Sequence, residues 1–276
     1  RDYKVTGVQT CALPIYCVRK VMFAAFTAVF ATALFLLTPQ PANLANAYAY
    51  SNNGNNGENA YANFDNHLQN LYHECNLSAK GLSFNTFKLA VTGFYNLKRE
   101  GQIAAHKNRV AIVDFTKPSN EKRLYIVDLA TRSLVYHTYV AHGKNSGYIY
   151  AERFSNNPES LQSSLGFYRT EETYIGQHGY SLRLDGLDKG FNENARSRAI
   201  VMHGAAYVGE DYVKRAGRTG LSWGCPAVSE AESGPIIDYL KSGNCMFIYG
   251  NNINYINSSK YLNFSGAINY YTQSQP

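Results

Sequence analysis

The chain has 276 residues, of which 45% are hydrophobic and 17% are charged, and its formal net charge is +6. This length and apolar content suit one domain with a substantial core. Lysine and arginine are not clustered, and the charge is too mild for a nucleic-acid-binding protein, so we expect no nucleic-acid partner.

The N-terminal part of the chain has the pattern of an export signal. Residues 1–16 resemble translated sequencing-adapter read-through rather than native protein, so we exclude them from the fold. Arg19 and Lys20 then precede an uncharged apolar run, 21–37, and two small-x-small cleavage candidates follow. A basic start, an apolar centre and a small-residue site predict a secretory signal peptide over 17–49.

An uncleaved membrane anchor is the alternative interpretation of this segment, because the apolar run is close to spanning length. Both interpretations place the rest of the chain in the periplasm or another extracytoplasmic compartment. Contact with a membrane is expected only through the N-terminal segment, if it stays uncleaved. Without the leader, four basic residues and one acidic residue are lost, which leaves a net charge of about +3.

Three cysteines follow the leader: Cys75, Cys225 and Cys245. An odd number in an oxidising compartment leaves at least one thiol unpaired. If Cys225 must be free to react, Cys75 and Cys245 are the only possible pair. Cys245 opens an apolar run that is typical of a core strand, so a buried reduced thiol is an equal alternative to that disulfide.

Two helices are predicted after an Asn/Gly-rich linker over 50–62. The first helix carries one apolar face at helical spacing: Phe64, Leu68, Leu71, Tyr72 and Cys75. Ser83 is a plausible N-cap for the second, whose stripe contains Phe87, Val91, Phe94 and Tyr95. The pair is too small for its own core, so we expect it to brace the domain that follows.

The pattern changes to strands from residue 110 onward. β-branched and aromatic runs separated by turn residues predict strands over 110–115, 124–129, 134–141, 166–170, 173–175, 182–184, 199–203 and 245–249. A helix is expected over 229–241, and the Asn/Ser/Tyr-rich tail, 251–276, is expected to be irregular. The prediction is an α+β fold: a mostly β catalytic domain over 63–250 with an N-terminal pair of helices.

The residues best suited to catalysis are His203 and the Ser-Trp-Gly-Cys run at 222–225. A cysteine thiolate attacks carbonyls, and an imidazole can take its proton and return it to a leaving amine. Gly224 lets backbone N–H groups approach a developing oxyanion. Ser222 could orient the imidazole, and backbone donors with His203 could favour the Cys225 thiolate. A buried thiol beside a core histidine is the structural alternative.

These residues, with several flanking segments, resemble the murein L,D-transpeptidase catalytic domain family, the YkuD-like cysteine transpeptidases. The family pattern is a strand ending in His-Gly, a loop, and then Ser-x-Gly-Cys. The segments that carry the likeness are 139–144, 163–170, 182–187, 199–204, 217–218 and 222–227. Together they cover roughly residues 64–250, which makes the likeness far more specific than the histidine and cysteine alone.

The resemblance implies a peptidoglycan substrate. Cys225 would attack the carbonyl of the third, L-linked stem residue and expel the terminal D-alanine. The thioester would pass to an amine on another stem peptide, which gives a 3–3 crosslink, or to water, which makes the enzyme an L,D-carboxypeptidase. A non-catalytic peptidoglycan-binding protein is the remaining alternative. No nucleotide or metal is needed, so no cofactor is expected.

The chain departs from the commoner family pattern on both sides of the cysteine. Trp223 stands where histidine or arginine is frequent, and no arginine follows Cys225 closely. Arg218 could replace that charge. We expect Arg218, Trp223 and Tyr207 to contact substrate, the first through stem carboxylates. The segment 204–221 is either a mobile lid or a static surface loop.

Three other enzyme classes fit the residues less well. A sortase-like transpeptidase also places histidine before cysteine, but it needs an arginine soon after the cysteine. A papain-like endopeptidase has its histidine after the cysteine, and no histidine follows Cys225. A zinc hydrolase could use His142, His178 and His203, but their spacing matches no metal motif, so no metal ligands are predicted.

Overall fold

The computed structural model describes residues 55–275. The adapter-like segment 1–16 and the predicted signal peptide 17–49 lie outside the described residues. Among residues 55–275, none of the helices combines the length and the apolar character that crossing a bilayer would require. All three described cysteines, Cys75, Cys225 and Cys245, are free thiols and buried.

One eight-stranded sheet organises the domain, in the order β3-β2-β1-β8-β4-β5-β6-β7. Neighbouring strands are antiparallel except for the β1–β8 and β6–β7 pairs. The strands are β1 (Arg109–Asp114), β2 (Leu124–Asp128), β3 (Ser133–Thr138), β4 (Gly166–Gly176), β5 (Gly179–Gly186), β6 (Val201–Gly204), β7 (Ala227–Val228) and β8 (Cys245–Tyr249). The predicted α+β, mostly β architecture is confirmed.

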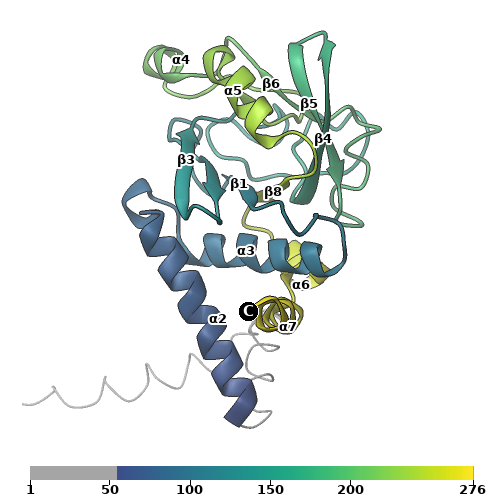
Figure 1. The fold of residues 1–276 in the computed structure, drawn as a ribbon. Helices are drawn as coiled ribbons and strands as arrows, with labels where there is room; N and C mark the ends of the chain where they lie inside the picture. Colours follow the sequence, from purple (N-terminus) through teal and green to yellow (C-terminus); the bar gives the residue numbers. More distant parts are fainter. Residues whose placement is uncertain (1–54, 276) are drawn as a thin grey trace, which may run out of the picture. The chain divides into compact units, whose positions relative to one another are not determined.

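Two groups of helices lie at opposite ends of the domain (Figure 1). The first contains α2 (Asn55–Glu74), α3 (Phe84–Arg99), α6 (Ile253–Ser258) and α7 (Phe264–Ser274), with short 3-10 turns η2 (Ser78–Lys80) and η3 (Lys260–Leu262). The second contains α4 (Glu210–Ala216) and α5 (Glu230–Leu240). We call the part formed by α2, α3, α6, α7, β1, β8 and the start of β4 the bracing end. The part formed by β6, β7 and the loop 222–225 is the reactive end.

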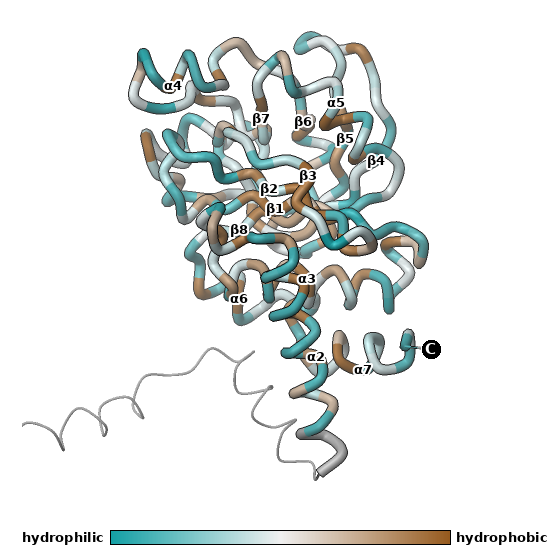
Figure 2. Tube along the Cα trace, turned by 60° about the vertical axis from the view of Figure 1, so that its left-hand side comes forward, coloured by the Kyte–Doolittle hydropathy of each residue, from teal (hydrophilic) through white to brown (hydrophobic). Residues whose placement is uncertain are grey.

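Apolar packing holds the bracing end together. Every residue of β8 is buried, and the Phe167 ring stacks on Phe247 with centroids 4.3 Å apart. Helix α3 approaches these rings closely because Gly93 has no side chain; a Cβ there would lie 1.8 Å from the Phe167 ring. Hydrophobic segments concentrate on β1 and β2 in Figure 2, whereas α4 is hydrophilic.

The predicted helix pair is present, and it braces the sheet as expected. Ser83 caps α3, since its hydroxyl accepts a hydrogen bond from the Thr86 N–H at 3.0 Å. The predicted linker over 50–62 is wrong for its described part, because α2 begins at Asn55. Tyr61 within it packs against the core, and its hydroxyl accepts a hydrogen bond from Lys88. These contacts favour the helix in a sequence rich in asparagine.

The prediction of an irregular tail over 251–276 is also wrong. Helices α6 and α7 form there because Asn252 and Asn263 act as N-caps, accepting from Tyr255 N–H and Gly266 N–H. Helix α7 packs on α3, and the Asn96 side chain donates to the carbonyls of Tyr261 and Asn263 at 2.8 Å each. The core of the domain therefore extends beyond residue 250.

Asp188 anchors this C-terminal segment to the sheet. Its buried carboxylate accepts hydrogen bonds from the Phe167 N–H at 2.7 Å, the Ser259 hydroxyl at 2.5 Å and the Tyr255 hydroxyl at 3.2 Å. Burial raises the pKa of Asp188 to about 6, and the three donors act against this shift. The carboxylate thus ties α6 to the start of β4.

Candidate active site

Strand β6 delivers His203 into the reactive end, between β5 and β7. The imidazole is only 2% exposed, and its Nδ1 lies 2.9 Å from the carbonyl oxygen of Gly204. A carbonyl can only accept, so Nδ1 carries the proton and Nε2 keeps its lone pair. Burial lowers the pKa of His203, because it disfavours the imidazolium. The resting ring is therefore a neutral base at pH 7.

The Cys225 thiol lies beside the first residue of β6. Its Sγ accepts a hydrogen bond from the Val201 N–H at 3.5 Å and donates to the Ala199 carbonyl at 3.7 Å. Cys225 stands two residues before Ala227, the register partner of His203. Among the hydrogen bonds of the described residues, none joins Cys225 directly to His203.

Burial raises the pKa of the Cys225 thiol, whereas the Val201 N–H and the Arg198 charge lower it. Because burial is the largest of these effects, the expectation that this turn favours the thiolate is wrong. The resting pair consists of a neutral thiol and a neutral imidazole.

Ser222 shapes the cysteine turn rather than the imidazole. Its hydroxyl donates to the Cys225 carbonyl at 2.7 Å and accepts from the Gly224 N–H at 3.1 Å. The expectation that Ser222 orients His203 is therefore wrong, and the Gly204 carbonyl does so instead. The Ser222 bonds occupy the Gly224 N–H, whereas no acceptor in the described part of the chain takes the Cys225 N–H.

Gly224 is required by the shape of the turn. Its φ of +126° lies in a region that L side chains rarely adopt, and a Cβ would lie 2.8 Å from the Gln162 carbonyl oxygen. The Gly224 carbonyl in turn accepts from the buried Ser163 hydroxyl at 3.3 Å. Substitution here would displace the thiol even if the nucleophile itself were unchanged.

His142 supports the same turn from the other side through its backbone. Its carbonyl accepts the Ser222 N–H at 2.9 Å. Its Nδ1 accepts from the buried Arg123 guanidinium at 2.7 Å, and its Nε2 donates to the Gly147 carbonyl at 3.2 Å. Burial and Arg123 lower the pKa of His142 to about 4. Both nitrogens are occupied, so His142 is available neither as a base nor as a zinc ligand.

Arg198 is a charged neighbour of the cysteine turn that the sequence did not reveal. Its guanidinium donates to the carbonyls of Ser155 and Gln162 at 2.8 and 2.7 Å and to the Ser160 hydroxyl at 3.1 Å. Its charge, rather than that of Arg218, lowers the pKa of Cys225. The one signal in the sequence was the position of Arg198 immediately before the predicted strand 199–203.

Arg218 and Tyr207 belong to the segment 204–221, which contains α4. The Arg218 guanidinium lies 4.0 Å from the Tyr148 ring centroid and donates to the Thr219 carbonyl. The half-buried Tyr207 packs against Gly220, where a Cβ would lie 2.5 Å from the Tyr207 Cβ. Burial and then Cys225 raise the pKa of Tyr207 to about 12. Tyr207 therefore lies within electrostatic reach of the thiol.

Trp223 is the most exposed of the predicted site residues, at 73%. It borders a cavity of about 370 Å³ lined by Pro158, Glu159, Leu161, Ser197, Arg198 and Trp223. Glu159 and Leu161 both have left-handed backbone, with φ of +57°. Such strain in non-glycine residues gathers at functional sites. The cavity lies beside the cysteine turn, since Arg198 and Trp223 flank both.

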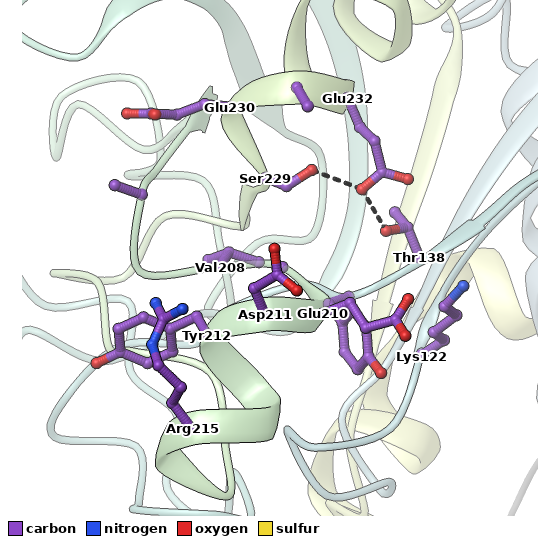
Figure 3. A pocket seen from close by; sticks show the side chains of 14 residues that line it. Lys122, Thr138, Val208, Glu210, Asp211, Tyr212, Arg215, Ser229, Glu230 and Glu232 are labelled. Atoms are coloured by element: carbon purple, nitrogen blue, oxygen red, sulfur yellow. Dashed lines mark hydrogen bonds between the residues drawn. The ribbon is translucent and has the colours of Figure 1, made fainter.

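A second cavity, of about 510 Å³, lies between α4 and the start of α5 (Figure 3). It is lined mostly by charged and polar side chains, among them Lys122, Glu210, Asp211 and Glu230. Glu232 at its wall accepts hydrogen bonds from the Ser229 and Thr138 hydroxyls, each at 2.6 Å. Neither Cys225 nor His203 lines this cavity. Reactive groups, not volume, therefore locate the candidate active site.

The model of one protein family, the L,D-transpeptidase catalytic domain, matches residues 78–249. The chain belongs to this family. The match contains the whole site described above, from His142 through His203 to Cys225. A search of curated proteins gives no match.

Solved structures of L,D-transpeptidases resemble the chain at low identity. The one from Mycobacterium smegmatis is 11% identical with a TM-score of 0.33, covering 52% of this chain and 59% of that chain. Those from Xylanimonas cellulosilytica and Stackebrandtia nassauensis are 17% and 15% identical, with TM-scores of 0.32 and 0.31. They cover 53% and 59% of this chain and 62% and 66% of theirs. The chain thus spans about three fifths of the structures that it matches.

Proposed function

We propose that this family member is a cysteine acyl-transferase that acts on peptidoglycan stem peptides outside the cytoplasm. The observation that carries the proposal is the arrangement of β6, which contacts the Cys225 thiol at Val201 and carries His203 with Nδ1 held by Gly204, so that Nε2 keeps its lone pair. A thiol and a base that are both neutral at rest are suited to transferring a proton as the sulfur attacks.

In the first half of the reaction, Cys225 Sγ attacks the carbonyl carbon of the third stem residue and its proton passes to His203 Nε2. The resulting oxyanion would accept from the Cys225 N–H, which has no other acceptor in the described chain. Collapse of this intermediate breaks the bond to the terminal D-alanine. The D-alanine amine takes the proton from His203, and a thioester remains on Cys225.

In the second half, the amine of another stem peptide attacks the thioester and gives its proton to His203. The Cys225 sulfur leaves and is protonated again, which yields a 3–3 crosslink. Water in place of the amine yields a tripeptide, the product of an L,D-carboxypeptidase. Trp223, Arg218 and Tyr207 are proposed to contact the stem peptide, since Trp223 and Arg198 border one cavity and Arg218 offers a fork for carboxylates.

Mass spectrometry of purified protein incubated with tetrapeptide muropeptides tests this function. Release of D-alanine with a crosslinked dimer supports transpeptidation, and release with tripeptide alone supports carboxypeptidation. Binding of muropeptides without any turnover, unchanged in Cys225→Ser, would support the non-catalytic alternative and contradict the proposal.

A further inference from the structure

A tight turn places His178 at the tip of the hairpin formed by β4 and β5. Gly176 and Gly179 are register partners, so Gln177 and His178 form the turn between them. Gly179 has a φ of +71°, the left-handed conformation that closes such a turn. The hairpin extends toward the end of the domain where β6 lies (Figure 1). His178 itself is exposed to solvent.

From this turn the His178 ring lies flat on the ring of His203. The two centroids are 4.2 Å apart and the ring planes differ by 18°. Strand β5 pairs with β6 so that Ser181 is the register partner of His203, which brings the hairpin tip over the imidazole. His178 thereby covers one face of a ring that is almost wholly buried, while His178 itself is exposed.

We propose that His178 is a positioning residue that closes one face of the His203 imidazole, so that a charge at the hairpin tip acts directly on that ring. This inference rests on the proposed function, in which His203 is the general base. It adds a second imidazole to the site, one that contacts the base and is accessible from solvent.

Apart from His178, the neighbours of His203 in the described chain are backbone groups, a hydroxyl and the cysteine turn. The Gly204 carbonyl holds Nδ1, Cys225 precedes β7, and α5 brings the backbone of Glu230 and the Ser233 hydroxyl against Gly204. Burial lowers the pKa of His203, the Gly204 carbonyl raises it, and His178 lowers it. A proton on His178 thus opposes a second proton on the ring beneath it.

The sign of the effect follows from this repulsion. A positive charge stacked on the His203 ring disfavours its protonation, whereas an uncharged ring in the same place does not. His178→Phe keeps a stacking ring without the charge, so the pKa of His203 should rise. His178→Lys adds a lasting positive charge at the same place, so that pKa should fall. Gln177→Ala changes the other residue of the same turn and should leave the pKa of His203 unchanged.

NMR titration of the His203 ring in the full chain measures this directly, without any need for substrate. The Phe and Lys variants should differ by on the order of half a pH unit or more, with the Phe variant higher. The acid limb of kcat/KM for stem-peptide turnover should move in the same order. Equal His203 pKa values in the two variants would overturn the proposal.

The two proposals can fail separately. If wild-type protein does not turn over stem peptides, the proposed function fails, yet the NMR order still decides whether His178 tunes His203. Should Phe disturb the turn, the rate of Cys225 alkylation across pH 5–7 provides a second comparison of the Lys and Gln177→Ala variants. A Lys variant whose profile coincides with that of Gln177→Ala would also count against the role of His178.

Discussion

The bracing end and the reactive end of the domain are held by different forces. At the bracing end, Phe167 and Phe247 stack under a helix that Gly93 allows to approach closely. At the reactive end, hydrogen bonds from buried polar groups such as Ser163 and Ser222 fix the backbone of the cysteine turn. Packing supplies stability in the first region, and hydrogen bonds supply geometry in the second.

This difference separates the effects that substitutions should have. A change at the bracing end should reduce the free energy of unfolding and leave the chemistry of the remaining folded protein intact. A change at the reactive end should reduce the rate with a smaller effect on unfolding. The substitutions below test that separation, from the largest expected effect to the smallest.

His203→Ala should reduce kcat/KM for stem peptides by on the order of 10²–10⁴-fold, the usual range for a positioned proton carrier. Because burial lowers the pKa of His203, wild-type activity should persist as pH falls from 7 toward 6.5 and decline only below that. Steady-state kinetics between pH 5 and 8 provide the measurement. A loss below tenfold would assign the base elsewhere, and His142, with both nitrogens occupied, is not a ready substitute.

Phe167→Ala should destabilise the fold by about 3–5 kcal/mol, since it removes a fully buried ring between Phe247 and α3. Chemical denaturation measures the loss. The pH profile of the protein that remains folded should match that of wild type. A changed acid limb would show that the two ends are coupled, and the separation would be abandoned.

Asp188→Asn tests the contact between α6 and the sheet. The pKa of Asp188 is raised to about 6, so its ionisation opposes folding, and this penalty appears as pH rises from about 4 to about 6. The stability of wild type relative to the variant should fall by about 2–3 kcal/mol across that window, at 1.36 kcal/mol per pKa unit. A difference that stays constant between pH 4 and 7 would show that the three donors keep the carboxylate ionised throughout.

Arg218→Ala should have the smallest effect, about tenfold on turnover of a stem peptide that bears carboxylates. The guanidinium lies over the Tyr148 ring and has no hydrogen bond to the cysteine turn among the described residues, so alkylation of Cys225 by a small neutral reagent should change little. The informative quantity is the loss in stem-peptide turnover divided by the loss in the rate of Cys225 alkylation. Equal losses would mean that Arg218 supports the loop, and its role in binding carboxylates would be withdrawn.

The sequence correctly predicted the helices and strands that have a clear local pattern of apolar residues. The stripe that includes Phe87, Val91 and Phe94 identified α3, and apolar runs identified the central strands. The C-terminal helices were missed because asparagines such as Asn252 and Asn263 are also typical of loops. The contacts that hold these helices, α7 on α3 and α6 on Asp188, join segments far apart in the sequence. Composition cannot distinguish an asparagine in a loop from one that caps a helix.

The site shows the same limit. Family resemblance indicated His203, Cys225, Ser222 and Gly224, but not what each contacts. Ser222 bonds to its own turn, and Arg198 rather than Arg218 acts on the thiol. Such roles depend on which strands become neighbours. The β5–β6 register brings His178 onto His203, and the β6–β7 pairing brings the start of β6 next to Cys225. Register is a property of the sheet and cannot be read from one segment.

The central claim is that Cys225 carries the acyl group during turnover. Mass spectrometry of the intact protein, quenched in acid after brief mixing with a tetrapeptide stem, should show an adduct equal to the stem less D-alanine. Peptide mapping should locate that adduct on Cys225, and Cys225→Ala should carry none, whereas Cys75→Ala should carry as much as wild type. An adduct on another residue, or continued release of D-alanine by Cys225→Ala, would contradict the account.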